Sequence, residues 1–298
     1  MWRYLLIWVA SLTLGRLPVW LLYPLCDVAG EIAYWLRPGL RRKVLDNLHH
    51  VLGPQASPIQ LQRTARAVFR NVARYYADLV HMPYLDVYSF YCQHLTHHGF
   101  YEHFLPALSQ GKGVILLSGH LGNPELAVQG LLAHGIKVVA LTEPLHPPQL
   151  SQLVDRLRSR KGHTFLPVSV AGVRAAIKTL RQGGVVALMG DRDIQGPRAR
   201  LPFLGTEASM PIGPIEVALR TGAIVLPVFS FRRGHGLEVF VHPPMEITRG
   251  GSLEEDVLAN TLRFLQILET YVRRDPGQWI VLEAIWDTEE RKDNYGQG

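Results

Sequence analysis

Short apolar runs alternate with amphipathic stretches over residues 111–274. The continuous apolar runs predict buried strands near 113–118, 136–141, 163–168, 184–189, 223–230 and 236–241. Apolar positions at helical spacing between these runs predict helices near 124–134, 148–161, 170–182, 212–221 and 253–274. Strands and helices that alternate in this way indicate an α/β fold, with a central mixed, mostly parallel sheet flanked by helices.

The first third of the chain has a different pattern, typical of helices only. Residues 57–82 have helical periodicity, and residues 4–36 are largely apolar but are interrupted by Arg16 and Asp27. Because a membrane span needs about 20 apolar residues, we expect helices that lie in the membrane surface instead. Aromatic anchors and a basic cluster suit that location: Trp2, Trp8, Trp20, Trp35, and Arg37, Arg41, Arg42, Lys43. The alternative is a helical hairpin packed on the protein's own core.

These two patterns predict the domain organisation. Residues 1–90 form a helical, membrane-interfacial region, and residues 91–298 form the α/β domain on which those helices pack. We expect one continuous body, because no low-complexity linker separates the parts.

Composition narrows the choice of partners. Hydrophobic residues make up 47% of the chain and charged residues 19%, with a net charge of +6, which favours anionic partners such as membrane lipid. No nucleic-acid-binding motif is present, so nucleic acid is not an expected partner. The two cysteines, Cys26 and Cys92, are not in metal-type spacing and indicate a reducing compartment.

A polar segment follows the first predicted strand of the α/β region directly. It is His120-Leu121-Gly122-Asn123-Pro124-Glu125, in which Asn123 suits a helix N-cap and Pro124 the first helical position. The turn through Gly122 can bring the carboxylate of Glu125 within reach of the imidazole. A histidine that a carboxylate orients at a strand-to-helix turn is a candidate general base.

Two further predicted strands also end in polar residues. Glu143 follows the second strand, and Asp191, Arg192 and Asp193 follow the strand near 184–189. Since ligands of α/β sheets bind at the carboxyl ends of the strands, we expect these groups to line one cleft with His120. Asp191 and Asp193 could instead only cap a turn.

The motifs of other chemistries are absent. There is no Gly-x-Ser-x-Gly elbow and no glycine-rich phosphate loop. The economical role for His120 is therefore to deprotonate a substrate hydroxyl. Trp279 and Trp286 are expected to pack in the core or to face the membrane.

Four ordered blocks over about residues 95–245 resemble the lysophospholipid acyltransferase superfamily. They are Gly111 to Glu125; Glu143-Pro144-Leu145 with Leu157 to Gly162; Asp191-Arg192-Asp193 with Leu201 to Gly205 and Met210 to Pro214; and Thr221 to Val228. The branch resembles the bacterial lipid A acyltransferases and the mycobacterial phosphatidylinositol mannoside acyltransferases.

The resemblance implies transfer of a fatty acyl group from acyl-CoA or acyl-carrier protein to a hydroxyl of a glycolipid or phospholipid. It makes His120 the base and Glu125 its partner, and gives substrate contacts to Glu143, Arg158 and the Asp191-Arg192-Asp193 segment. It implies no metal and no cofactor beyond the donor substrate. A monomer at the cytoplasmic face of the inner membrane is expected, with a mannoside-type acceptor favoured.

Other interpretations remain open at this stage. A catalytically silent lipid-binding or scaffold protein would keep the same fold, and Arg158 could be a solvated helix charge beside Arg156 and Arg160. The backbone amides near Gly122 and Asn123 are candidates for an oxyanion site. A metal-dependent hydrolase would use the histidine-rich stretch, which holds His94, His97, His98 and His103.

Overall fold

A computed structural model describes residues 2–192 and 196–286. Its helices are α1 (Trp2–Thr13), α2 (Val19–Leu36), α3 (Pro38–Leu52), α4 (Pro58–His81), α5 (Val87–His94), α6 (Leu105–Ser109), α7 (Pro124–Gln129), α8 (Pro148–Ser159), α9 (Val170–Arg181), α10 (Gly213–Thr221) and α11 (Leu253–Arg274). Its strands are β1 (Leu95–His98), β2 (Val114–Ser118), β3 (Val138–Thr142), β4 (Thr164–Pro167), β5 (Val185–Met189), β6 (Arg198–Phe203), β7 (Thr206–Pro211), β8 (Ile224–Arg233) and β9 (Gly236–Val241). Short helical turns include η3 (Phe100–Phe104) and η4 (Gly130–His134).

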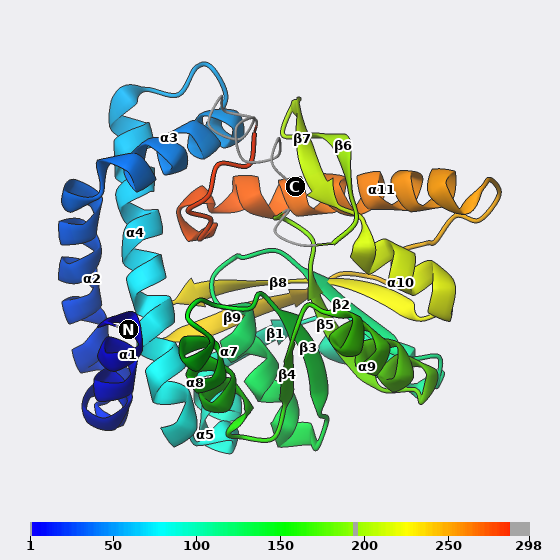
Figure 1. The fold of residues 1–298 in the computed structure, drawn as a ribbon, viewed down its shortest axis with the longest axis horizontal. Coiled ribbons are helices and arrows are strands. Elements are labelled where there is room, and N and C mark those ends of the chain that lie inside the picture. The colour runs from blue at the N-terminus through cyan, green and yellow to red at the C-terminus, as the bar shows by residue number, and fades with distance from the viewer. Residues whose placement is uncertain (1, 193–195, 287–298) are drawn as a thin grey trace.

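A seven-stranded sheet forms the centre of the molecule, in the order β1-β9-β8-β2-β5-β3-β4 (Figure 1). Every neighbouring pair is parallel except β8 and β9, which are antiparallel. The predicted mostly parallel sheet with flanking helices is therefore confirmed. Because β5 pairs with β2, residues that follow these two strands meet at one edge of the sheet.

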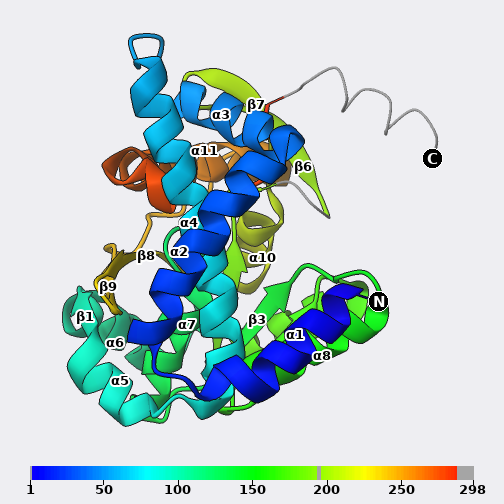
Figure 2. The same ribbon diagram turned by 90° about the vertical axis from the view of Figure 1, so that its left-hand side faces the viewer.

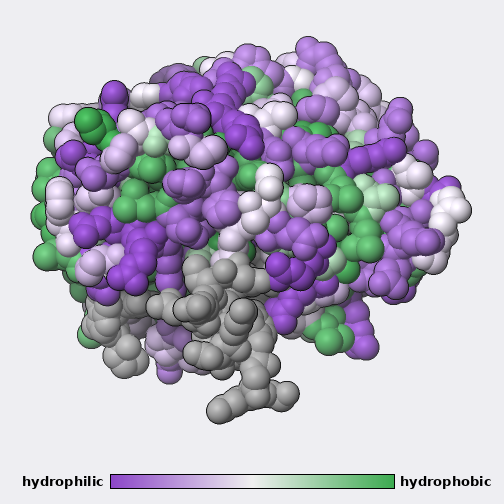
Figure 3. All heavy atoms as spheres, turned by 90° about the horizontal axis from the view of Figure 1, so that it is seen from above, coloured by the Kyte–Doolittle hydropathy of each residue, from purple (hydrophilic) through white to green (hydrophobic). Residues whose placement is uncertain are grey.

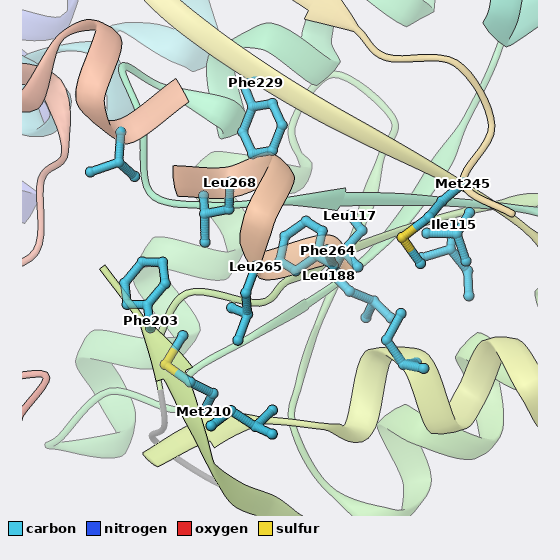
Figure 4. Packing of buried hydrophobic residues seen from close by; sticks show 14 of the residues in the cluster. Ile115, Leu117, Leu188, Phe203, Met210, Phe229, Met245, Phe264, Leu265 and Leu268 are labelled. Atoms are coloured by element: carbon cyan, nitrogen blue, oxygen red, sulfur yellow. The ribbon is translucent and has the colours of Figure 1, made fainter. Parts of the chain in front are cut away.

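Successive side chains of β2 point to opposite faces of the sheet, as strand geometry requires. Ile115 and Leu117 pack with α9, α10 and α11, and Figure 4 shows Phe264 of α11 beside Leu117 and Leu188. On the other face, Val114 and Leu116 pack against the segment from η3 to α6. The sheet is covered on both faces, so its central strands are apolar throughout.

Two strand regions were not among the predicted strands. The edge strand β1 lies in the histidine-rich stretch, and the hairpin β6–β7 forms a separate two-stranded sheet. The hairpin has an alternating pattern instead of a continuous apolar run: Leu201 and Phe203 are buried between exposed neighbours. Its two-residue turn uses Leu204 and Gly205, both at positive φ.

The helices of the first third pack on the rest of the protein through one face of α2 and α4. In Figure 2, α2 lies along α4 at the surface. Asp27 and Glu31, which interrupt the apolar run of α2, form ion pairs with arginines of α4, among them Asp27 with Arg74 at 2.5 Å. The hairpin interpretation is thus correct for the inner face.

The outer face of α1 and α2 is apolar and exposed. We call it the N-terminal apolar face; its residues are Leu5, Leu6, Trp8, Val9, Leu12, Trp20, Leu21, Leu25, Val28, Ile32, Trp35 and Leu36. Hydrophobic residues are visible along the left edge of Figure 3, the side on which Figure 1 has α2. Within the described residues, no helix combines the length and apolar composition that crossing a membrane requires.

Candidate active site

His120 lies in the loop between β2 and α7, and the backbone around it is fixed from one side. The segment 278–280 runs beside the loop: Ile280 N donates to His120 O at 2.8 Å, and Gly122 N donates to Gln278 O at 2.9 Å. Gly122 has φ +61°, and a Cβ there would lie 2.5 Å from the carbonyl oxygen of Ser230. Only glycine fits this turn.

The carboxylate of Asp191 fixes the loop from the other side and orients the imidazole. Asp191 follows β5 and is completely buried. Its Oδ1 lies 2.7 Å from Nδ1 of His120, and its Oδ2 accepts from the His120 backbone N at 2.7 Å and from Nε1 of Trp279 at 2.9 Å. Three donors therefore hold this carboxylate in one orientation.

The ionisation of Asp191 decides the tautomer of His120. Burial alone raises the pKa of this carboxyl, but the charge of His120 and its two hydrogen bonds outweigh burial and lower the pKa to about 2. An ionised carboxylate only accepts hydrogen bonds, so Nδ1 of His120 carries the proton that it donates. Nε2 is then left to accept a proton in the neutral ring.

Glu125 is not the partner of His120, which corrects the expected pair. In the described structure no hydrogen bond joins the two side chains, although Asn123 caps α7 and Pro124 begins it as predicted. Because the first turn of α7 directs Glu125 toward α8, its Oε2 accepts from Nε of Arg158 at 2.7 Å. The partner of His120 is thus Asp191, which is 71 residues away along the sequence, and not the nearby Glu125.

Arg158 is a buried member of this second ion pair. It is 8% exposed, and it also donates to the hydroxyl of Tyr75 at 2.9 Å. Burial alone lowers the pKa of the guanidinium, but Glu125 and Tyr75 outweigh it and raise the pKa. Arg158 is therefore not a solvated helix charge, and its described partners are protein groups. Contact with substrate stays a prediction.

Arg192 joins two of the expected cleft residues at the rim of the site. Its guanidinium contacts Glu283 at 2.6 Å and Glu143 at 3.3 Å. Burial raises the pKa of Glu283, but the charge of Arg192 outweighs it and lowers the pKa. Glu143, Asp191 and Arg192 thus meet at one edge, as predicted from their strand ends, whereas Asp193 lies outside the described residues.

The backbone amides that we considered for an oxyanion site are already engaged. Gly122 N donates to Gln278 O, and Asn123 N donates to Oγ of Ser230 at 3.3 Å. Neither amide is free to bind a substrate oxygen in this arrangement, which corrects that expectation.

The histidine-rich stretch is spread over β1 and its neighbours. His98 contacts Glu238 at 3.0 Å, and His97 lies 3.0 Å from the hydroxyl of Tyr91. Among the described residues, no three His, Cys, Asp or Glu side chains are grouped in a way that could hold a metal ion.

An apolar pocket lies next to the His120 loop, on the sheet face that α7 covers. It encloses about 850 Å³ of empty space, its open mouth included. Ser118, Pro124 and Glu125 line it beside the loop, and small side chains such as Ala140 and Ala187 leave room over the sheet. Apart from Glu125 and a few hydroxyl and histidine groups, its lining is hydrocarbon, so it suits an acyl chain better than a polar ligand.

Comparison with known proteins agrees with this combination of a histidine–carboxylate pair and an apolar pocket. The family model described as bacterial lipid A biosynthesis acyltransferase matches residues 1–288. The chain belongs to this family.

The names of two similar proteins state an acyltransferase activity. A protein of Mycobacterium tuberculosis named phosphatidylinositol mannoside acyltransferase is 28% identical over 291 residues, which is 96% of this chain and 88% of the relative. The protein of the same name from Mycolicibacterium smegmatis is 27% identical over 266 residues, 85% of this chain and 82% of the relative. This member of the lipid A biosynthesis acyltransferase family is accordingly an acyltransferase.

Sequence reasoning missed two residues of the site. Trp279 packs in the core as expected, but it also donates to Asp191, and Glu283 holds Arg192 at the rim. Both follow α11 in a segment that has no regular pattern, and no motif points to them. The presence of two tryptophans, Trp279 and Trp286, shortly after the long helix α11 is a weak sign that this segment packs inside the protein.

Proposed function

We propose that this protein transfers a fatty acyl group from an acyl thioester to a hydroxyl of a membrane glycolipid, with His120 as the general base. The observation that carries the proposal is the hydrogen bond between Nδ1 of His120 and the buried, ionised Asp191, in a loop that borders an apolar pocket. Glu125, the expected partner, instead lines that pocket and forms an ion pair with Arg158.

The chemistry follows from the tautomer. Nε2 takes the proton of the acceptor hydroxyl as its oxygen attacks the thioester carbonyl, and the imidazolium that forms is stabilised by Asp191. The tetrahedral intermediate then collapses, the carbon–sulfur bond breaks, and the thiolate takes the proton from the imidazolium. General-base assistance of this kind contributes about 10²–10⁴ in rate.

The pocket supplies the binding energy for the donor. Each methylene group of the acyl chain that moves from water into such an environment gains about 0.8 kcal/mol. The donor is acyl-CoA or acyl-carrier protein, and the thioester itself makes a cofactor or metal unnecessary. The names of the relatives favour phosphatidylinositol mannoside as the acceptor. Glu143 and Arg192, which pair at the rim of the site, would contact its polar part.

We further propose that the N-terminal apolar face rests in the membrane surface at the cytoplasmic side of the inner membrane. Its tryptophans suit the interface, and the basic start of α3 suits anionic headgroups. The enzyme would then lie next to the membrane that holds its glycolipid acceptor. It would act as a monomer.

The test uses the purified full-length protein and vesicles that contain one candidate acceptor each. Palmitoyl-CoA and palmitoyl-acyl-carrier protein are offered in parallel with a phosphatidylinositol mannoside or a lipid A precursor, and mass spectrometry follows the acceptor. We expect an acceptor heavier by one acyl group. The proposal fails if the donor is only hydrolysed, or if neither donor is consumed with any acceptor.

A further inference from the structure

We infer that Gly130 and the aromatic pair Tyr91–His97 set the length of the acyl chain that this enzyme accepts. The inference rests on the proposed function, because it assigns the apolar pocket to the acyl chain. It adds which end of the pocket the chain occupies and which side chains stop it.

The pocket extends laterally from the His120 loop to the edge of the sheet. Ser118 of β2 lines it next to the loop, and Leu95 and His97 of β1 line its far side. Since β8 and β9 lie between β2 and β1, the pocket crosses three strand spacings, roughly 14 Å, which is comparable with an extended chain of about eleven methylene groups. We call the far side, lined by Tyr91, Leu95 and His97, the β1 end.

Aromatic side chains close the β1 end. The Tyr91 hydroxyl lies 3.0 Å from Nε2 of His97 and 3.4 Å from the hydroxyl of Tyr101, and the ring of His134 packs edge-on against Tyr91. Because these polar atoms bond to one another, the rings of Tyr91 and His97 present mainly carbon to the pocket. Tyr101 beyond them is 56% exposed, so this cluster is the outer wall.

Gly130 lines the pocket near the β1 end and, being a glycine, contributes no side chain to its wall. Its φ of −60° is helical, so any L residue fits the backbone. A Cβ at this position would lie 3.0 Å from Leu95 Cδ2 and 3.7 Å from Tyr91 Cδ2. A larger residue at 130 would therefore crowd the β1 end, and the Leu95 side chain would have to move to make room for it.

The opposite side of the pocket, over β3 and β4, is a less suitable place for the chain. There Glu125 and Phe165 line the pocket, and Arg158 behind them pairs with Glu125 and lies 5.9 Å from the centre of the Phe165 ring. A chain in that direction would lie against charged groups and take the remaining water from them, which costs free energy. Ala140 lines this side, so a larger residue there tests whether the chain lies in this direction.

The test measures binding and transfer separately. In full-length protein with His120→Ala, saturated fatty acids of 10 to 20 carbons compete with a fluorescent fatty acid, and the enzyme with His120 intact is assayed with acyl-CoA donors of the same lengths. Gly130→Val should shift both preferences toward chains about two carbons shorter, with roughly tenfold discrimination against the original optimum. Gly130→Ala should shift them less, and Tyr91→Ala should admit longer chains.

Ala140→Val narrows the opposite side of the pocket and should change the preferred length less than Gly130→Val. Gly250→Val, at an exposed glycine outside the pocket where a Cβ meets nothing within 4 Å, is the control and should leave the preference unchanged. The inference is overturned if Ala140→Val shortens the preferred chain as much as Gly130→Val or more, or if Gly130→Val leaves the binding preference unchanged. If Gly130→Val shifts binding but no form of the protein transfers an acyl group, the assignment of the β1 end stands and the proposed function fails.

Discussion

Asp191 is the residue on which the ionisation of the site depends most. Its carboxylate holds both the imidazole and the backbone of His120. Asp191→Asn keeps the size of the side chain but removes the charge that fixes the tautomer. We predict that kcat falls by about 10²–10⁴, by analogy with other histidine–carboxylate pairs. Steady-state transfer rates at several pH values would measure the effect.

Glu125→Gln provides the contrast for that measurement. It breaks the ion pair with Arg158 but leaves the hydrogen bond between His120 and Asp191 in place. We expect a smaller loss of kcat and an unchanged shape of the pH–rate profile. The opposite ranking, with Glu125→Gln changing the profile and Asp191→Asn leaving it intact, would assign the orienting role to Glu125.

The lowered pKa of Asp191 also predicts how stability depends on pH. A carboxyl whose pKa is about 2 in the folded protein, below an ordinary value near 3.9, stabilises the fold above pH 4 and loses this contribution as the pH falls through 2. The contribution is about 2.6 kcal/mol, at about 1.36 kcal/mol for each unit of pKa difference. Urea unfolding should therefore show a loss between pH 4 and pH 2 that is smaller in Asp191→Asn; equal losses in both proteins would contradict the assignment.

At the scale of elements, α2 is amphipathic in a way that suits two surroundings. Its inner face packs on α4, and its outer face exposes Trp20 and Trp35 at 57% and 63%. We predict that the double substitution Trp20→Ser and Trp35→Ser reduces binding to anionic vesicles several-fold in a sedimentation assay. Each tryptophan that enters the membrane interface adds apolar area to the contact and so raises the affinity. Val170→Ser on α9 replaces a hydrophobic residue that is even more exposed, at 69%; it is the control and should bind like the parent protein. Equal sedimentation of all three proteins would exclude this face as the lipid-binding surface.

The elements themselves could largely be predicted from local pattern. The apolar runs at 113–118 and 184–189 became β2 and β5, and Asn123 and Pro124 set the start of α7. β6 and β7 were missed because only alternate residues of that hairpin are buried, and the edge strand β1 is too short and polar for a pattern search. The division of the chain at residue 90 stays a prediction.

The pairing inside the site could not be predicted, because it depends on strand order. Local geometry favoured Glu125, five residues from His120. The pairing of β5 with β2 instead brings Asp191 to the imidazole, and hydrophobic pattern does not specify which strands become neighbours. Convergence of strand ends on one edge was predictable; the choice among the converging carboxylates was not.

At the scale of the whole molecule, a buried polar network links α2 to the His120 loop. Asp78 of α4 accepts from Tyr23 of α2, from Asn123 of the loop and from Arg232 of β8. All four side chains are at most 5% exposed. The N-terminal helices are therefore joined to the loop that carries His120 through charged and polar groups as well as through apolar packing.

Breaking this network should destabilise the whole fold. Arg232→Met leaves the charge of Asp78 buried with fewer partners, and we predict a loss of about 3–5 kcal/mol in the free energy of unfolding. The double variant Asp78→Leu with Arg232→Met removes both charges and should recover part of that loss, as seen by chemical denaturation. A loss below about 1 kcal/mol for the single variant would contradict the prediction, because it would mean that water or a rearrangement of the chain stabilises the charge of Asp78.

The most direct measurement is the single-turnover rate of acyl transfer by His120→Ala, compared with the parent protein at equal thermal stability. The proposed mechanism predicts that this rate falls by at least about 10² while the melting temperature and fatty-acid binding are retained. A folded His120→Ala protein that still transfers the acyl group at the parental rate would contradict the assignment of His120 as the base.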